Sequence, residues 1–158
     1  MSVSMTSAGI VYSASQTVTG QTGASVTHQV LDHYEEGTWS PKMDSPGVST
    51  APDGQTASYT RIGNHVFVAW RFNTGANMAG ATSYWRVQRL PFTSNSSYYT
   101  GAVAMHSLGF DTAEQICTYV TSSDIYFMAN QNNAGWEDIG FGNGSSWYMM
   151  GSNYYRVA

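Results

Sequence analysis

The sequence predicts an all-β domain, built either as a sandwich or as a barrel. Leu occurs three times and Lys once among 158 residues, so the chain is poor in the residues that keep side-chain freedom in a helix. Turn signals recur roughly every ten residues from Leu31 onward, and the stretches between them alternate apolar and polar residues as half-buried strands do. Hydrophobic residues make up 42% of the chain and aromatic residues 14%, which argues against disorder.

Composition also excludes several functional classes. The formal net charge is −4 and no basic cluster occurs, so we expect no nucleic-acid binding. No apolar run approaches the roughly 18 residues of a membrane span, so we expect no membrane insertion. Cys117 is the single cysteine, which excludes an intrachain disulfide framework and a zinc site built from cysteines. The first residues lack the basic and apolar regions of a secretory signal.

Residues 1–30 differ from residues 31–158. They contain no acidic residue and no Lys or Arg, and they consist mostly of Ser, Thr, Gly, Ala, Gln and Val. Such a segment cannot bury enough apolar surface to fold alone. We therefore expect 1–30 to be an N-terminal stalk or attachment segment, either a flexible leader or one chain of an intertwined stalk. Residues 31–158 form the predicted head domain.

The predicted strands are separated by turn chemistry. Ser45–Gly47 and Ala51–Gly54 combine proline, which presets φ, with glycine, which accepts a positive φ. Further turns are predicted at Gly63, Gly75, Gly80, Gly101, Gly109, Asn132–Asn133, Gly135, Gly142–Gly144 and Gly151.

The clearest strand is 65–72, whose side chains alternate between two faces. The face predicted to lie in the core holds Val66, Val68, Trp70 and Phe72. The other face includes Phe67, so we expect another subunit to cover it. In the stretch 84–90, Trp85 and Val87 point the same way. Further strands are predicted at 101–106, 115–120, 124–129, 145–150 and 153–158.

The run LDHYEEGTWSP at 31–41 resembles the LDDYEEGTWTP signature of C-terminal domains in bacteriophage tail-fibre and related virion fibre proteins. Similar motifs follow in the family's order, ASYTRIGNHVFV at 57–68, LPFT at 90–93 and GSNYY at 151–155. Two departures are His33, where the family usually has Asp, and the aromatic, basic run 84–89. The structural signature comprises Leu31, Tyr34, Glu35, Glu36, Gly37, Trp39, Pro41, Gly63, Leu90, Pro91 and Phe92.

The resemblance implies a jelly-roll-like antiparallel β-sandwich that trimerises about a fibre axis, located in a virion at a tail fibre or the capsid surface. It further implies binding of a host-surface glycan or protein, without catalysis, and attachment to a tail or capsid adaptor, which we assign to residues 1–30. One alternative is a capsid decoration or head-fibre protein that binds no receptor. A glycan depolymerase or esterase is a third class.

No catalytic or metal site is expected. The pairs Glu35–Glu36 and Glu137–Asp138 are adjacent residues, which point to opposite faces of a strand, so neither forms a glycosidase dyad. We expect Glu35 and Glu36 to be structural, as caps or as partners of Arg61 or Arg89. The histidines lack metal-ligand spacing, although a trimer could gather three copies of His28 or His33 around an axial metal. No cofactor is expected.

Aromatic residues give the best indication of a binding site. A sugar packs its apolar face on an aromatic ring while polar groups bond its hydroxyls. The surplus at Tyr98–Tyr99, Trp136, Trp147–Tyr148, Tyr154–Tyr155 and Trp85 exceeds what one small core is expected to hold. We expect the receptor site in loops 73–83 and 130–138 and at the paired tyrosines. The predicted binding residues are Asn77, Tyr98, Tyr99, Asn132, Asn133, Trp136, Glu137 and Asp138.

Overall fold

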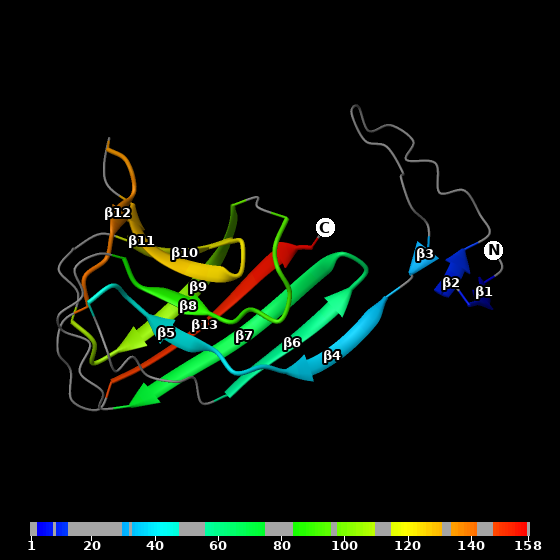
Figure 1. Ribbon diagram of the computed structural model, residues 1–158, viewed down its shortest axis with the longest axis horizontal. Helices are drawn as coiled ribbons and strands as arrows, with labels where there is room; N and C mark the ends of the chain where they lie inside the picture. The colour runs from blue at the N-terminus through cyan, green and yellow to red at the C-terminus, as the bar shows by residue number, and fades with distance from the viewer. Residues whose placement is uncertain are drawn as a thin grey trace.

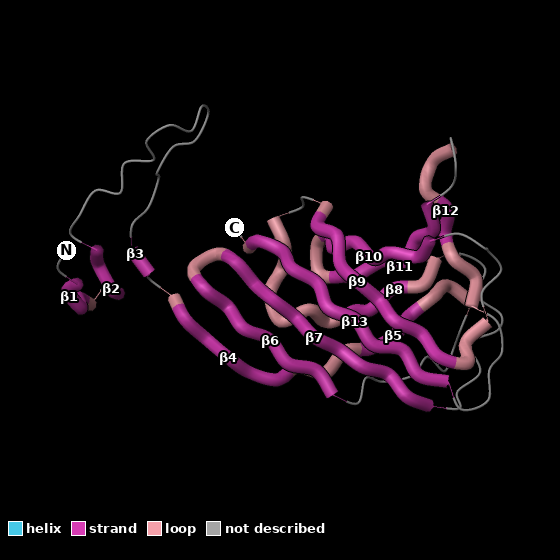
Figure 2. The backbone as a smooth tube through the Cα atoms, turned by 180° about the vertical axis from the view of Figure 1, so that it is seen from behind, coloured by secondary structure: helices cyan, strands magenta, loops and turns pink. Residues whose placement is uncertain are grey.

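A computed structural model describes residues 3–7, 9–12, 30–31, 33–47, 56–74, 84–95, 98–109, 115–130, 134–141 and 147–157. These residues are all-β and contain no helix, so none of them belongs to a helix that could cross a membrane (Figure 2). The strands are β1 (Val3–Thr6), β2 (Gly9–Tyr12), β3 (Val30–Leu31), β4 (Tyr34–Thr38), β5 (Lys42–Asp44), β6 (Thr56–Ile62), β7 (His65–Thr74), β8 (Arg86–Gln88), β9 (Tyr99–His106), β10 (Gln115–Thr121), β11 (Asp124–Asn130), β12 (Glu137–Asp138) and β13 (Trp147–Arg156).

Ten of these strands form one antiparallel sheet that curls into a half-barrel (Figure 1). Its order is β4-β6-β7-β13-β9-β10-β11-β8-β5, with β12 paired to β11 off this path. β4 and β5 lie at opposite ends of the path, yet only Trp39–Pro41 separate them along the chain. A link of that length spans at most about 14 Å, so the two ends of the sheet must come close together. The short link therefore requires the curl.

The N-terminal strands form a separate, three-stranded antiparallel sheet in the order β1-β2-β3. Val3 pairs with Tyr12 across the first hairpin, and Ile10 pairs with Leu31 on the other side of β2. The predicted stalk segment 1–30 thus supplies β1, β2 and the first residue of β3.

The concave side of the half-barrel is the core, and the predicted inward face of β7 is confirmed. Its four side chains are buried, with relative exposures of 0–3% at Val66, Val68, Trp70 and Phe72. Trp85 and Val87 point the same way, as predicted, and both are fully buried because they face the same interior from β8 and the residue before it. On the opposite face of β7, Phe67 is 48% exposed.

Two predicted turns are wrong, because Gly101 and Gly151 lie inside β9 and β13. The predicted final strands 145–150 and 153–158 are consequently one continuous strand, β13. A Cβ at Gly151 would lie 2.2 Å from Trp70 Cζ2, and a Cβ at Gly101 would lie 2.2 Å from Asn153 Nδ2. These glycines leave space for a neighbouring side chain to lie across the backbone. Gly63 does occupy its predicted turn, with a φ of 59°.

Asn153 is the centre of a buried polar network. It is 4% exposed and pairs with Gly101 across the sheet, so its side chain extends over that glycine. Its Nδ2 donates to Thr118 Oγ1 at 2.9 Å, and its Oδ1 accepts from Trp70 Nε1 at 3.2 Å. The network joins β7, β13 and β10 inside the core.

Candidate functional site: an exposed aromatic patch

The β10–β11 hairpin places two tyrosines side by side on the convex face of the sheet. Tyr119 and Tyr126 are paired across the hairpin, and their rings stack at 5.2 Å with an interplanar angle of 14°. Their chain neighbours Val120 and Ile125 are fully buried on the concave side. The alternation of a strand therefore fixes both tyrosine rings on the outside.

Three more rings extend this pair. Tyr84, just before β8, lies 5.3 Å from Tyr126. Tyr98, just before β9, lies 5.4 Å from Tyr119, and Trp136, just before β12, lies 5.7 Å from Tyr119. Tyr98 and Trp136 are 6.0 Å apart and are 65% and 61% exposed. We call these five residues the aromatic patch: Tyr84, Tyr98, Tyr119, Tyr126 and Trp136.

The structure thus brings together two binding residues that were predicted from separate parts of the chain, Tyr98 and Trp136. Tyr99 does not join them, because its half-buried ring packs against the core and its hydroxyl donates to Asn95 Oδ1 at 2.9 Å. Asn77, Asn132 and Asn133 lie outside the described residues.

The predicted aromatic surplus is smaller than expected. Trp85, Trp147 and Tyr155 are fully or almost fully buried, so the core holds three rings that were candidates for the surface. These three rings are therefore part of the core and not of a binding surface.

Sequence reasoning missed three members of the patch. Tyr119 and Tyr126 lie at equal distances from the turn Thr121–Asp124, so the register of a tight hairpin would have paired them. Tyr84 belongs to the aromatic and basic run 84–89, but nothing in its local sequence indicates its contact with Tyr126.

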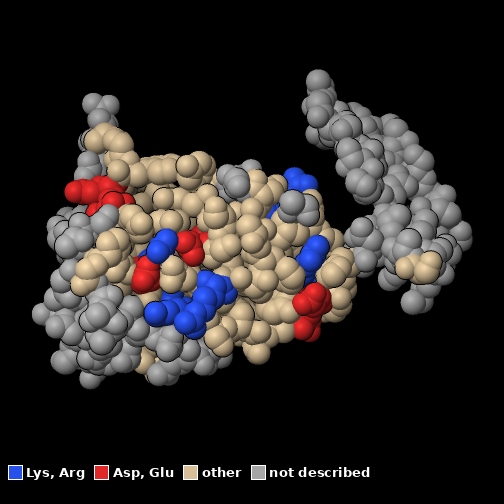
Figure 3. Space-filling view, viewed as in Figure 1, with Lys and Arg blue, Asp and Glu red and all other residues tan. Residues whose placement is uncertain are grey.

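Two carboxylates border the patch. Glu137 and Asp138 form β12, both are exposed, and Asp138 pairs with Met128 of β11. Figure 3 shows acidic side chains gathered over this strand. Burial, the neighbouring tyrosines Tyr126 and Tyr98, and the charge of Asp138 together raise the pKa of Tyr119. Tyr119 therefore carries a neutral hydroxyl at physiological pH.

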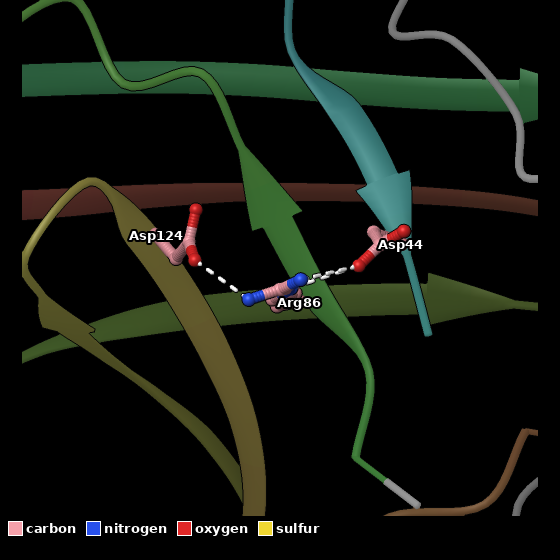
Figure 4. A network of polar contacts seen from close by, with 3 residues as sticks. All are labelled: Asp44, Arg86 and Asp124. Carbon is pink, nitrogen blue, oxygen red and sulfur yellow. Dashed lines mark hydrogen bonds and ion pairs between the residues drawn. The ribbon is translucent and has the colours of Figure 1, made fainter. Parts of the chain in front are cut away.

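A charged network supports the other end of the patch (Figure 4). Arg86 donates to Asp44 Oδ2 from Nε at 2.9 Å and from Nη2 at 2.7 Å, and to Asp124 Oδ2 from Nη1 at 3.0 Å. Its guanidinium carbon lies 5.7 Å from the centroid of the Tyr84 ring. Burial of Arg86 lowers its pKa. The hydrogen bonds to Asp44 and Tyr126, together with the charges of Asp124 and Asp44, outweigh burial, so the pKa of Arg86 is raised. Arg86 thus remains charged and holds this edge in place.

The signature run lies at the opposite edge of the sheet. As predicted, Glu35 and Glu36 face opposite sides of β4. Glu35 accepts a hydrogen bond from Tyr59, and His33 Nε2 lies 3.1 Å from its Oε2. Bonds from Tyr59 and His33 lower the pKa of Glu35, with a smaller contribution from Arg61.

His33 therefore has a physical role beside Glu35. His33 can donate to Glu35, whereas Asp at this position would bring a second negative charge beside that carboxylate.

Several signature residues join the strands of this edge. Tyr59 lies over Gly37, where an added Cβ would be 2.7 Å from its ring, and the Gly63 backbone N–H donates to the His33 carbonyl oxygen at 2.8 Å. Pro41 and Leu90 are buried, and Trp39 and Phe92 pack against the core. Leu90 follows β8, and its backbone N–H donates to the Ser123 carbonyl oxygen in the β10–β11 turn at 3.2 Å. These contacts are structural.

Within the described ranges, no group of three or more His, Cys, Asp or Glu side chains could hold a metal ion. The arrangement in the patch is suited to non-covalent recognition, since it offers flat apolar surfaces bordered by hydroxyls and carboxylates. No protein-family model matches this chain, and no curated protein matches it either.

Proposed function

We propose that this chain is a bacteriophage virion fibre protein whose head binds a host-surface receptor, a glycan, for adsorption. The observation that carries the proposal is the aromatic patch, with Tyr98 and Trp136 more than 60% exposed beside Glu137 and Asp138. The resemblance of residues 31–41 to the fibre signature supplies the biological context. The head is a jelly-roll-like sandwich, formed by the two halves of the curled sheet, and it acts as a homotrimer.

The patch has the chemistry that a sugar site requires. Tyr98 and Trp136 expose apolar ring surface to water. Binding is favourable when the apolar face of a pyranose covers these rings and removes that surface from water. Tyrosine hydroxyls and the two carboxylates can bond sugar hydroxyls, so that the receptor's polar groups are not left unsatisfied. The stacked pair Tyr119–Tyr126 and the Arg86 network keep the rings in place before the receptor arrives.

A second exposed apolar surface supports the homotrimer. Tyr34, Ile62 and Phe67 are 62%, 40% and 48% exposed and lie on the convex face of neighbouring strands β4, β6 and β7. Burial of such rings between subunits is favourable. Three copies of the patch would then act together, and multivalent attachment can raise avidity by about 10²–10⁴ over a single weak site.

The alternative is a capsid decoration or head-fibre protein that binds no receptor. The same apolar surface favours it, because Tyr34, Ile62 and Phe67 could contact another virion protein rather than a second copy. Deletion of residues 1–30 separates the two proposals. If the deletion variant no longer attaches to the virion but still binds cells, the adhesin is supported. If even the intact protein does not bind cells, the structural alternative is supported.

A glycan array tests the adhesin directly. We expect the intact protein to bind a defined group of glycans, and Tyr98→Ala or Trp136→Ala to weaken that binding by about tenfold or more, as loss of a stacked ring predicts. Met150→Ala is the control, because it removes an exposed apolar side chain that belongs neither to the patch nor to the proposed subunit surface. Binding that is unchanged in Tyr98→Ala and Trp136→Ala would refute the site.

A further inference from the structure

We propose that the receptor carries an alkylammonium group, either a trialkylammonium or a protonated amine, and that Tyr98, Tyr119 and Trp136 hold this cation. The inference rests on the proposed function and names the ligand class of its site. It is argued from ring geometry, from the charges around the rings and from where the chain's own cations lie.

The three rings form a triangle in which each contacts both others. The centroid separations are 5.4, 5.7 and 6.0 Å, and the interplanar angles are 50°, 32° and 64°. A small cation above this triangle can lie within about 6 Å of all three centroids, the range in which the electron-rich ring faces attract positive charge. A flat sugar alone needs only one or two rings, whereas three mutually tilted rings suit a rounded cationic group.

The charges around the patch favour the same ligand. Glu137 and Asp138 directly follow Trp136, both are exposed, and the negative charge of Asp138 acts on Tyr119. Arg86, on neighbouring strand β8, is bonded to both Asp44 and Asp124, so its charge is directed at them rather than at a ligand.

The chain already uses rings to hold cations elsewhere. Arg61 lies 4.9 Å from the Phe92 centroid, Arg71 lies 5.8 Å from Tyr148, and Arg86 lies 5.7 Å from Tyr84. The triangle differs from those three pairs because its Tyr98 and Trp136 rings are more than 60% exposed to solvent. This surface favours an incoming cation and disfavours sulfated, phosphorylated or carboxylated glycans, whose charge the carboxylates would repel.

Choline and its neutral carbon isostere, in which carbon replaces the nitrogen, make a direct test. They share shape and differ in charge, so their affinity ratio for the full-length protein, measured by titration with Trp136 fluorescence or NMR detection, isolates the contribution of the cation. We expect choline to bind about tenfold or more tightly than the isostere. Trp136→Ala should abolish the difference, Asp138→Asn should reduce it, and Met150→Ala, outside both the patch and the proposed subunit surface, should leave it unchanged.

Equal affinities for the two probes, or no choline binding, would overturn the inference. The glycan array then decides the proposed function separately. If neutral glycans still bind in a Trp136-dependent manner, the receptor site stands and only its preference for a cation is wrong. If no glycan binds in that manner, the proposed function fails as well.

Discussion

Replacement of Asn153 by Ala should strongly destabilise the head, because one side chain satisfies two buried partners. The change removes the bond to Thr118 Oγ1 and leaves Trp70 Nε1 without its acceptor inside the core. Each net hydrogen bond contributes about 0.5–1.5 kcal/mol, and an orphaned buried donor costs about 1–3 kcal/mol. We therefore expect a loss of about 2–4 kcal/mol in the free energy of unfolding.

Urea denaturation followed by tryptophan fluorescence measures this loss as a shift in the midpoint at constant slope. Protein concentration must be the same for all variants, since an oligomer's apparent stability depends on it. Thr118→Val removes one of the two bonds and leaves Asn153 Nδ2 without its acceptor, so it should cost about 1–3 kcal/mol. Thr100→Val, on the exposed side of neighbouring strand β9, is the control and should stay within about 0.5 kcal/mol of the parent.

A loss below about 0.5 kcal/mol for Asn153→Ala would refute the reasoning, because it would mean that the network is absent or that water replaces it without cost.

Two further predictions concern the edges and interior of the sheet. Gly151→Ala should lower the free energy of unfolding by about 1–3 kcal/mol or more in urea denaturation, because its Cβ would lie 2.2 Å from Trp70. The loss should be smaller in a Trp70→Leu background. Equal losses in both backgrounds would contradict the proposed overlap. Glu35→Gln should lower the melting temperature above about pH 5, where the depressed pKa of Glu35 contributes stability, and the difference should close as the pH falls through and below the ordinary value of 4.5. Glu36→Gln, on the opposite face of β4, is the control, and a pH-independent difference for Glu35→Gln would contradict this assignment.

The fold class and the inward faces could be predicted from the sequence because they depend on local alternation. Val66 and Phe72 are six positions apart, so a strand puts them on one face. Gly101 and Gly151 could not be interpreted locally. Their role depends on Asn153 and Trp70, whose side chains lie over these glycines from neighbouring positions in the sheet. In the sequence alone, a glycine of this kind cannot be distinguished from a glycine in a turn.

The candidate site was predictable in part for the same reason. Trp136 and Tyr98 were candidates because aromatic residues beside polar loop residues are typical of binding surfaces, and that pattern is local. Their contact at 6.0 Å depends on β12 pairing with β11, and the contribution of Tyr84 depends on β8 pairing with β11. The β8–β11 pairing joins residues 38 and 40 positions apart, and the sequence contains no motif that specifies either pairing.

The most direct test of the account is to map where the receptor binds on this chain. The strongest array ligand can be titrated into isotope-labelled protein while NMR spectra record the backbone and indole N–H shifts. We expect the largest shifts to cluster at Tyr98, Tyr119 and Trp136, with the Trp136 indole among them. Shifts that cluster on the surface around Phe67, or that leave Trp136 unchanged at saturation, would contradict it.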